Sequence, residues 1–249
     1  MPLLAFVLGA IFGSFANVLI YRIPRGESVI WPGSRCPACG HPLRWWENVP
    51  LLSFALLRGR CAACAAPISW RYPLVELGVA LIFAYAVARH GLSWDALSTV
   101  TLGVLLVVVF FIDLEHRIVP DRLTLPGMVL GLLLSFARAG LPGFFGALLS
   151  GIGAGGVLML VALLSRGGMG GGDIKLAAML GCFLGWPRVA VGMFAGVLLG
   201  GLGAFALLVA GRKSRKDYIP FGPALALGGF VGMEWGSQLL SAYLRLFGL

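Results

Sequence analysis

Charged residues are scarce in this sequence, and their scarcity indicates the class of protein. Only 12% of the 249 residues are charged, whereas 59% are hydrophobic, and the mean hydropathy is +0.94. A soluble domain carries about 25% charged residues, so about half of the usual polar surface is missing. This composition excludes an ordinary soluble domain and predicts a polytopic membrane protein whose apolar helices face lipid.

Motifs of several common chemistries are also absent. The sequence has no H-E-x-x-H zinc-protease motif, no G-K-[ST] ending to a phosphate loop and no Rossmann fingerprint. Its net charge of +9 requires no nucleic-acid partner, because anionic lipid headgroups supply enough counter-charge. The N-terminal apolar run lacks the basic segment of a signal peptide, so we expect a retained transmembrane helix.

Long apolar runs occupy most of the chain. They predict an all-α membrane bundle of about eight transmembrane helices, since a span needs about 20 residues. The runs cover residues 3–20, 73–89, 96–113, 118–136, 143–164, 174–186, 188–210 and 219–247. The sixth run is short for a bilayer about 30 Å thick, so we expect its helix to begin below the membrane surface or in a thinned region.

Lysine and arginine are distributed unevenly about these runs. If residues 22–72 are cytoplasmic, four of the 19 basic residues fall on the outer face, Arg89, Arg138, Arg188 and Arg245, and the rest fall inside. This positive-inside pattern places both termini outside. The predicted domains are a first transmembrane helix at 1–21, a cytoplasmic domain at 22–72 and a transmembrane helical domain at 73–249.

The cytoplasmic segment contains two C-x-x-C pairs, formed by Cys36, Cys39, Cys61 and Cys64. Four thiolates can close a tetrahedral zinc site, and a segment this small buries too little core to fold without such help. The alternative is two disulfides, which the reducing cytoplasm disfavours. We therefore expect a structural zinc site with no open position for catalysis. Cys182 lies in an apolar run and is expected to be a packing residue.

Two aspartates stand at the ends of apolar runs. Asp113 lies in VVVFFIDLEHRIVPD, and Asp173 follows Gly170, Gly171 and Gly172 in GMGGGDIK. A charge well inside a bilayer costs about 2.5–3.5 kcal/mol, so such residues usually serve ion pathways, proton relays or catalysis. The glycines disfavour continuous helix and predict an irregular, water-accessible approach to Asp173. The alternative is that Asp173 merely caps a helix beginning at Ile174.

The two aspartates could act together. At a separation of about 4 Å and an effective dielectric near 20, ionising both carboxylates would cost roughly 4 kcal/mol, so the pair would hold one shared proton. One acid and one base can activate water and protonate a leaving amine, which is peptide hydrolysis. Paired membrane carboxylates also relay protons, so a proton-coupled transporter is the alternative. A scaffold with a docking zinc domain is a third interpretation.

The motifs, taken in order, resemble those of the type IV prepilin peptidases, which are leader peptidase/N-methyltransferases. The matching segments are GSFANVLIYRIPRGES, the CPAC and CAAC pairs, RYPLVE, FIDLEHRIVPD and GMGGGDIK. The resemblance implies a bacterial inner-membrane aspartic endopeptidase of the G-x-G-D type, with Asp113 and Asp173 as its pair. Its expected substrates are type IV prepilins and type II secretion pseudopilins, whose short basic leaders are cut at the cytoplasmic face.

The resemblance also implies a second activity, N-methylation of the new N-terminal residue by S-adenosylmethionine. No cofactor-binding residue can be assigned from the sequence, although 22–72 is the expected region. Among the few acidic residues, we expect Asp121 to have a structural role at a helix start and Glu76 to form an interhelical hydrogen bond. Glu115, two residues after Asp113, is hypothesised to orient the basic leader.

Overall fold

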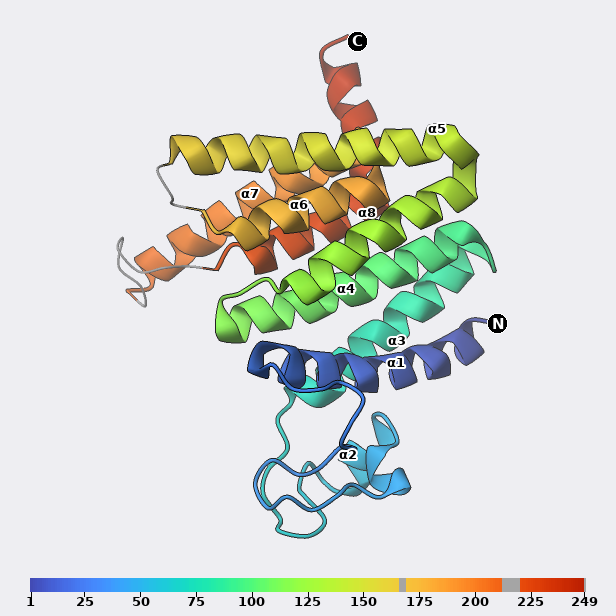
Figure 1. Cartoon of the computed structure of the whole chain (residues 1–249), viewed down its shortest axis with the longest axis vertical. Coiled ribbons are helices and arrows are strands. Elements are labelled where there is room, and N and C mark those ends of the chain that lie inside the picture. Colours follow the sequence, from blue (N-terminus) through green and yellow to red (C-terminus); the bar gives the residue numbers. More distant parts are fainter. Residues whose placement is uncertain (166–168, 212–219, 249) are drawn as a thin grey trace. The chain divides into compact units, whose positions relative to one another are not determined.

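Helices form most of the described structure (Figure 1). The computed structural model describes residues 1–165, 169–211 and 220–248, and these residues contain no β-strand, only two isolated bridges. The elements are α1 (Pro2–Arg22), η1 (Ile23–Arg25), η2 (Trp45–Asn48), α2 (Leu52–Leu56), α3 (Arg71–His90), α4 (Trp94–His116), α5 (Asp121–Leu164), α6 (Gly171–Leu184), α7 (Arg188–Val209) and α8 (Gly222–Leu246). The predicted all-α class is confirmed.

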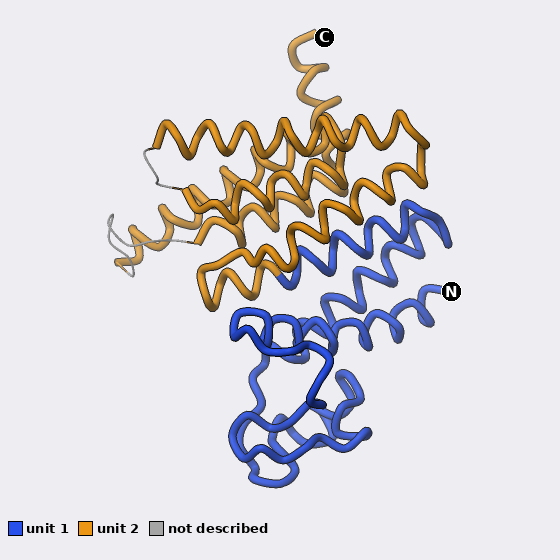
Figure 2. The backbone as a smooth tube through the Cα atoms, in the orientation of Figure 1, with its two compact units in different colours: residues 1–108 blue, residues 109–249 orange. Residues whose placement is uncertain are grey.

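The chain forms two compact units, whose boundary lies within α4 (Figure 2). Unit 1 is Met1–Val108 and holds α1, α3 and the cysteine-containing segment between them. Unit 2 is Val109–Leu249 and holds the end of α4 together with α5 to α8.

Five helices are long and apolar enough to cross a membrane by length and composition: α1 extended through η1, α3, α4, α5 and α7. Several apolar spans are thus present, although the predicted number of eight is not confirmed. Two predicted runs, 118–136 and 143–164, fall within α5, which has 44 residues. Its backbone leaves helical geometry at Ala139 and Gly140, and Gly140 has a φ of 63°.

In unit 1, α1 packs against α3 at very short range. A Cβ atom added to Gly13 of α1 would lie only 2.6 Å from the Cα atom of Glu76 in α3. Small residues allow helix backbones to approach closely in lipid, where packing rather than the hydrophobic effect drives association. The close contact places the C-terminal end of α1 beside the start of α3, where the cysteine-containing segment begins and ends.

In unit 2, α6 is the enclosed helix. It packs against α5, α7 and α8, and nine of its fourteen residues are buried. Leu176, Met179 and Leu180 have no exposed surface, and Cys182 is buried and forms no disulfide, as expected for a packing residue. A helix that is apolar on all sides is suited to a protein interior.

Candidate active site and metal centre

Asp113 and Asp173 are far apart in the sequence but come together in unit 2. Asp113 lies in the last turn of α4, and Asp173 is the third residue of α6. Their side chains are only 3% and 5% exposed. The two carboxyl groups are close enough to interact electrostatically. Two buried acids that interact electrostatically are an arrangement suited to acid–base hydrolysis.

A third segment, the start of α8, completes the surroundings of Asp113. The backbone N–H of Gly222, the first residue of α8, donates to the Asp113 carboxylate. The Oδ2 atom of Asp113 is buried and has no hydrogen-bond partner within the described residues. A Cβ atom on Gly222 would lie 2.6 Å from this oxygen. Any residue other than glycine at this position would therefore displace the Asp113 carboxylate. Sequence reasoning missed Gly222, although a Gly–Pro pair is a recognised helix-start signal.

The backbone before Asp173 is more regular than expected. Gly170 is extended, with φ −72° and ψ 142°, but α6 begins at Gly171, so Gly171 and Gly172 are helical. The helix therefore begins three residues before Ile174, the residue at which the predicted run starts. First-turn N–H groups have no intrahelical acceptor in any case, which reduces the penalty for glycine there. Gly172 also lies against Val119, whose Cβ atom would be 2.8 Å from an added Cβ.

Asp173 contacts the backbone at the start of its own helix as well as facing Asp113. Its carboxylate accepts the backbone N–H of Gly170, and its own N–H donates to the Gly170 carbonyl over 3.1 Å. Asp173 is thus not the N-cap residue of a helix beginning at Ile174, because Gly170 occupies the N-cap position of α6. The hydrogen bond from Gly170 holds the carboxylate in place without using its interaction with Asp113.

Other acids have local partners. Asp121 is the first residue of α5, as expected, and both its carboxylate oxygens accept from Lys175 Nζ at 2.7 Å. Glu76 does not bond between helices as expected: its Oε2 atom accepts the backbone N–H of Leu51 at 2.7 Å. Glu115 lies near the end of α4, with Oε2 4.0 Å from His116 Nε2. Its proposed contact with a leader stays a prediction.

Some basic residues used to predict the orientation lie outside the described residues. They are Arg166, Arg212, Lys213, Arg215 and Lys216. The placement of the termini therefore stays a prediction.

The four cysteines of the C-x-x-C pairs form one cluster in unit 1. The sulfur atoms of Cys36, Cys39, Cys61 and Cys64 all lie within 4.8 Å of one another, and no disulfide joins them. Two similar turns create the cluster: the N–H of Cys36 donates to the His41 carbonyl, and the N–H of Cys61 donates to the Ala66 carbonyl, both over 2.9 Å. Such paired turns present two sulfurs each to a single ion.

The electrostatics of the cluster also suit a metal. The backbone N–H groups of Cys64 and Ala63 donate to the Cys61 sulfur and lower the pKa of its thiol to about 6. Cys61 is therefore a thiolate at neutral pH, which is the form that binds metal. Four sulfurs at this spacing fit a closed tetrahedral zinc site better than two disulfides.

Known proteins with similar sequences share both halves of the chain. The bacterial peptidase A24 N-terminal domain matches residues 7–90, and the type IV leader peptidase family matches residues 100–205. A relative from Pseudomonas putida is 36% identical and covers 98% of this chain and 94% of its own length. One from Bacillus subtilis is 36% identical over 97% of each chain. One from Myxococcus xanthus is 43% identical over 85% of this chain and 64% of its own length.

All three relatives are named prepilin leader peptidase/N-methyltransferase. No solved structure matches significantly. The names of the relatives support the enzyme interpretation, and nothing among them supports the transporter.

Proposed function

The chain belongs to the type IV leader peptidase family, and we propose that it is a membrane enzyme that removes the leader from prepilins and type II secretion pseudopilins. Cleavage takes place at the cytoplasmic face of the bacterial inner membrane. The observation that carries the proposal is the pair of buried carboxylates, Asp113 from α4 and Asp173 from α6, in mutual electrostatic contact.

The pair acts by sharing one proton. The ionised carboxylate takes a proton from water as the water oxygen attacks the scissile carbonyl carbon. The protonated carboxyl group then donates its proton to the leaving nitrogen, so the carbon–nitrogen bond breaks and an amine departs. The pair again holds a single proton at the end, with the two groups exchanged in role. The N–H groups of Gly222 and Gly170 hold the two carboxylates in position.

The second activity follows the first. The freed amine is methylated, and S-adenosylmethionine supplies the methyl group. The cytoplasmic domain, residues 22–72, is held together by a structural zinc on Cys36, Cys39, Cys61 and Cys64, whose sulfur cluster supports this assignment. Glu115 orients the basic residues of the leader near the scissile bond.

The proposed topology has eight spans, arranged as a first helix at 1–21 and a helical domain at 73–249 around the cytoplasmic segment. The break at Ala139–Gly140 supports dividing α5 into two spans. α6 and α8 complete the number, although neither is among the helices that qualify by length and hydropathy alone. Both termini then lie outside, and lipid surrounds the bundle.

The decisive experiment is to replace each aspartate in turn. Asp113→Asn and Asp173→Asn should each lower leader cleavage by roughly a thousandfold or more, because the acid–base exchange needs both groups. A peptide with a basic leader, assayed in detergent, provides the measurement. Asp95→Asn is the matched control, because Asp95 is an exposed residue in the first turn of the same helix as Asp113. Near-normal cleavage by either active-site variant would remove that residue from the mechanism.

A further inference from the structure

A polar cavity in unit 1 has no part in peptide hydrolysis. It has a volume of about 700 Å³ and lies where α1, the start of α3 and the cysteine-containing segment meet. Ser14, Asn17 and Tyr21 line it from α1, and Tyr72 and Glu76 line it from α3. The volume is within the usual range of about 300–1,000 Å³ for small-molecule sites.

Two buried polar side chains in its lining have hydrogen-bonding capacity that the fold leaves unused. The Nδ2 atom of Asn17 donates to the carbonyls of Gly13 and Tyr72, at 3.4 and 3.1 Å, which fixes the orientation of the amide. Its Oδ1 atom is buried without a partner within the described residues, and the residue is only 3% exposed. Glu76 is 9% exposed and accepts the Leu51 N–H through Oε2 alone. Burying a hydrogen-bond acceptor without a donor costs free energy of folding. The unpaired acceptor therefore indicates a bound ligand that supplies the missing donor.

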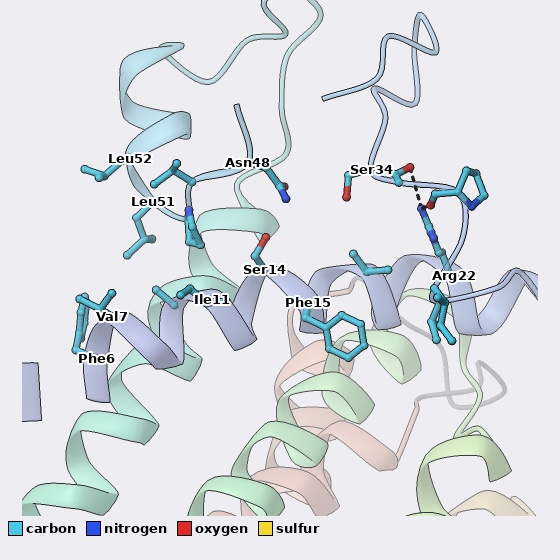
Figure 3. Close-up of a pocket in the computed structure, with 18 of the residues that line it drawn as sticks. Phe6, Val7, Ile11, Ser14, Phe15, Arg22, Ser34, Asn48, Leu51 and Leu52 are labelled. Atoms are coloured by element: carbon cyan, nitrogen blue, oxygen red, sulfur yellow. Dashed lines mark hydrogen bonds between the residues drawn. The ribbon is translucent and has the colours of Figure 1, made fainter. Parts of the chain in front are cut away.

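An apolar groove adjoins this cavity. It has a volume of about 990 Å³ and runs along α1, where Phe6, Val7 and Ile11 face Leu51 and Leu52 (Figure 3). The groove and the cavity share part of their lining, formed by Ser14, Val18, Arg22, Pro32, Ser34 and Asn48. The shared wall is held in place by Arg22, which donates to the carbonyls of Ser28, Pro32 and Gly33.

We propose that the polar cavity binds S-adenosylmethionine and that the apolar groove receives the apolar N-terminal residue of the cut product. The proposal rests on the methyl transfer of the proposed function. Phe54 and Tyr72 offer rings for the adenine, Asn17 offers an acceptor for a hydroxyl or amino group, and Glu76 supplies the negative charge that a sulfonium requires. The free amine then lies at the wall shared by cavity and groove.

This arrangement satisfies the requirements of methyl transfer. The neutral amine attacks the methyl carbon of S-adenosylmethionine while the carbon–sulfur bond breaks, and sulfur keeps that bonding pair. The products are a thioether and a secondary ammonium, which releases its proton to water. The two ligands must approach from opposite sides of the methyl carbon, which two adjoining cavities with a common wall permit.

Binding measurements test the assignment without depending on turnover. Titration calorimetry should show that Glu76→Gln weakens S-adenosylmethionine by about tenfold, whereas S-adenosylhomocysteine, which lacks the sulfonium charge, changes by less than about threefold. Gln can still accept the Leu51 N–H, so the fold is kept. Equal weakening of both ligands, or no weakening of either, would overturn the role of Glu76. Asp95→Asn is the control, because Asp95 is an exposed residue of unit 1 that lines neither the cavity nor the groove, so this variant should bind both ligands normally.

A second measurement keeps the proposal testable if Glu76→Gln fails to fold. Ultraviolet cross-linking of labelled S-adenosylmethionine to the unmodified protein should label peptides containing residues 14–21 or 68–76. Label found only elsewhere would overturn the site while leaving the proposed function intact. If the unmodified protein binds neither S-adenosylmethionine nor S-adenosylhomocysteine, methyl transfer itself is wrong, so the two failures are distinguishable.

The groove has its own test. Ile11 lines the groove but not the polar cavity. Ile11→Trp should raise the KM for the cut peptide in methylation at least about fivefold while leaving the affinity for S-adenosylhomocysteine unchanged. An unchanged KM would show that the product does not lie in the groove.

Discussion

The cysteine domain and the aspartate site both gather reactive side chains, but over very different distances along the chain. Each C-x-x-C turn is closed by hydrogen bonds between residues at most nine positions apart, such as Cys36 with His41 and Ser34 with Leu43. The aspartate site instead needs the end of α4 and the starts of α6 and α8. The first site depends on local turns whose four sulfurs could hold a metal ion, whereas the second depends on helix packing.

This difference predicts that each site can be damaged separately. Substitutions that move a helix end by a fraction of an ångström should abolish hydrolysis without changing the metal content. Substitutions in the turns should change metal binding or domain stability and leave the aspartates in place.

The largest separable effect is expected at Gly222. Gly222→Ala places a Cβ atom 2.6 Å from the Asp113 Oδ2 atom, so the carboxylate must shift. Such a displacement should reduce leader cleavage by roughly a hundredfold, because alignment of the two carboxyl groups is lost. Zinc content, measured by elemental analysis, should not change. Gly156→Ala is the matched control, since a Cβ there meets nothing within 4 Å. Full activity in Gly222→Ala would show that α8 does not position Asp113.

Loss of a cysteine from the cluster should instead lower the zinc content and affect leader cleavage less. Cys36→Ser should lower the zinc content from the expected value of about one ion per chain and destabilise the cysteine-containing segment, seen as rapid proteolysis within residues 22–72. Cys182→Ala should retain zinc, because Cys182 is buried in α6. Leader cleavage should fall less than methylation in Cys36→Ser. Full zinc occupancy in this variant would disprove the four-cysteine site.

A smaller effect is expected from Glu47, which contacts residues next to the first C-x-x-C turn. Glu47 accepts the Arg44 N–H at 2.6 Å and contacts His41 Nε2 at 3.3 Å, and the Arg44 N–H is the main reason that its pKa is lowered below the ordinary 4.5. Because the folded-state pKa is the lower one, the stabilisation is complete above about pH 4.5 and disappears as pH falls through the lowered value.

Glu47→Gln should therefore reduce the thermal stability of the domain at pH 7, and its difference from the unmodified protein should shrink below pH 4.5. Tryptophan fluorescence during heating provides the measurement. Glu27→Gln is the control, because Glu27 is exposed. A difference that persists unchanged at low pH would mean that the charge of Glu47 contributes nothing.

The smallest effect compares the two turns directly. Gly40 and Ala65 follow the second cysteine of each pair, and both are left-handed, with φ of 73° and 57°. The left-handed conformation costs a non-glycine residue about 1–2 kcal/mol, partly offset by the greater unfolded-state freedom of glycine. Ala65→Gly should thus raise domain stability by up to about 1 kcal/mol, and Gly40→Ala should lower it by a similar amount. Denaturant unfolding that shows the reverse signs would indicate that the turns are not equivalent.

Much of this protein was predictable because it depends on composition and short-range spacing. Scarce charge and long apolar runs predict membrane helices, since every lipid-facing segment must be apolar wherever it lies in the fold. The C-x-x-C pairs predict a metal cluster, because a turn of that length brings two sulfurs to one ion regardless of what surrounds it. The two aspartates stand out for the same reason, as rare carboxylates at the ends of apolar runs.

Tertiary packing decided the rest. Gly172, at the start of α6, lies against Val119, and the position of Gly222 beside Asp113 depends on where α8 begins relative to α4. The polar cavity exists because Gly13 lets α1 approach the α3 residue Glu76. None of these contacts leaves a local pattern, because each joins residues far apart in the chain through the close approach of helices. Which carboxylates meet, and which cavities adjoin, is set by that packing alone.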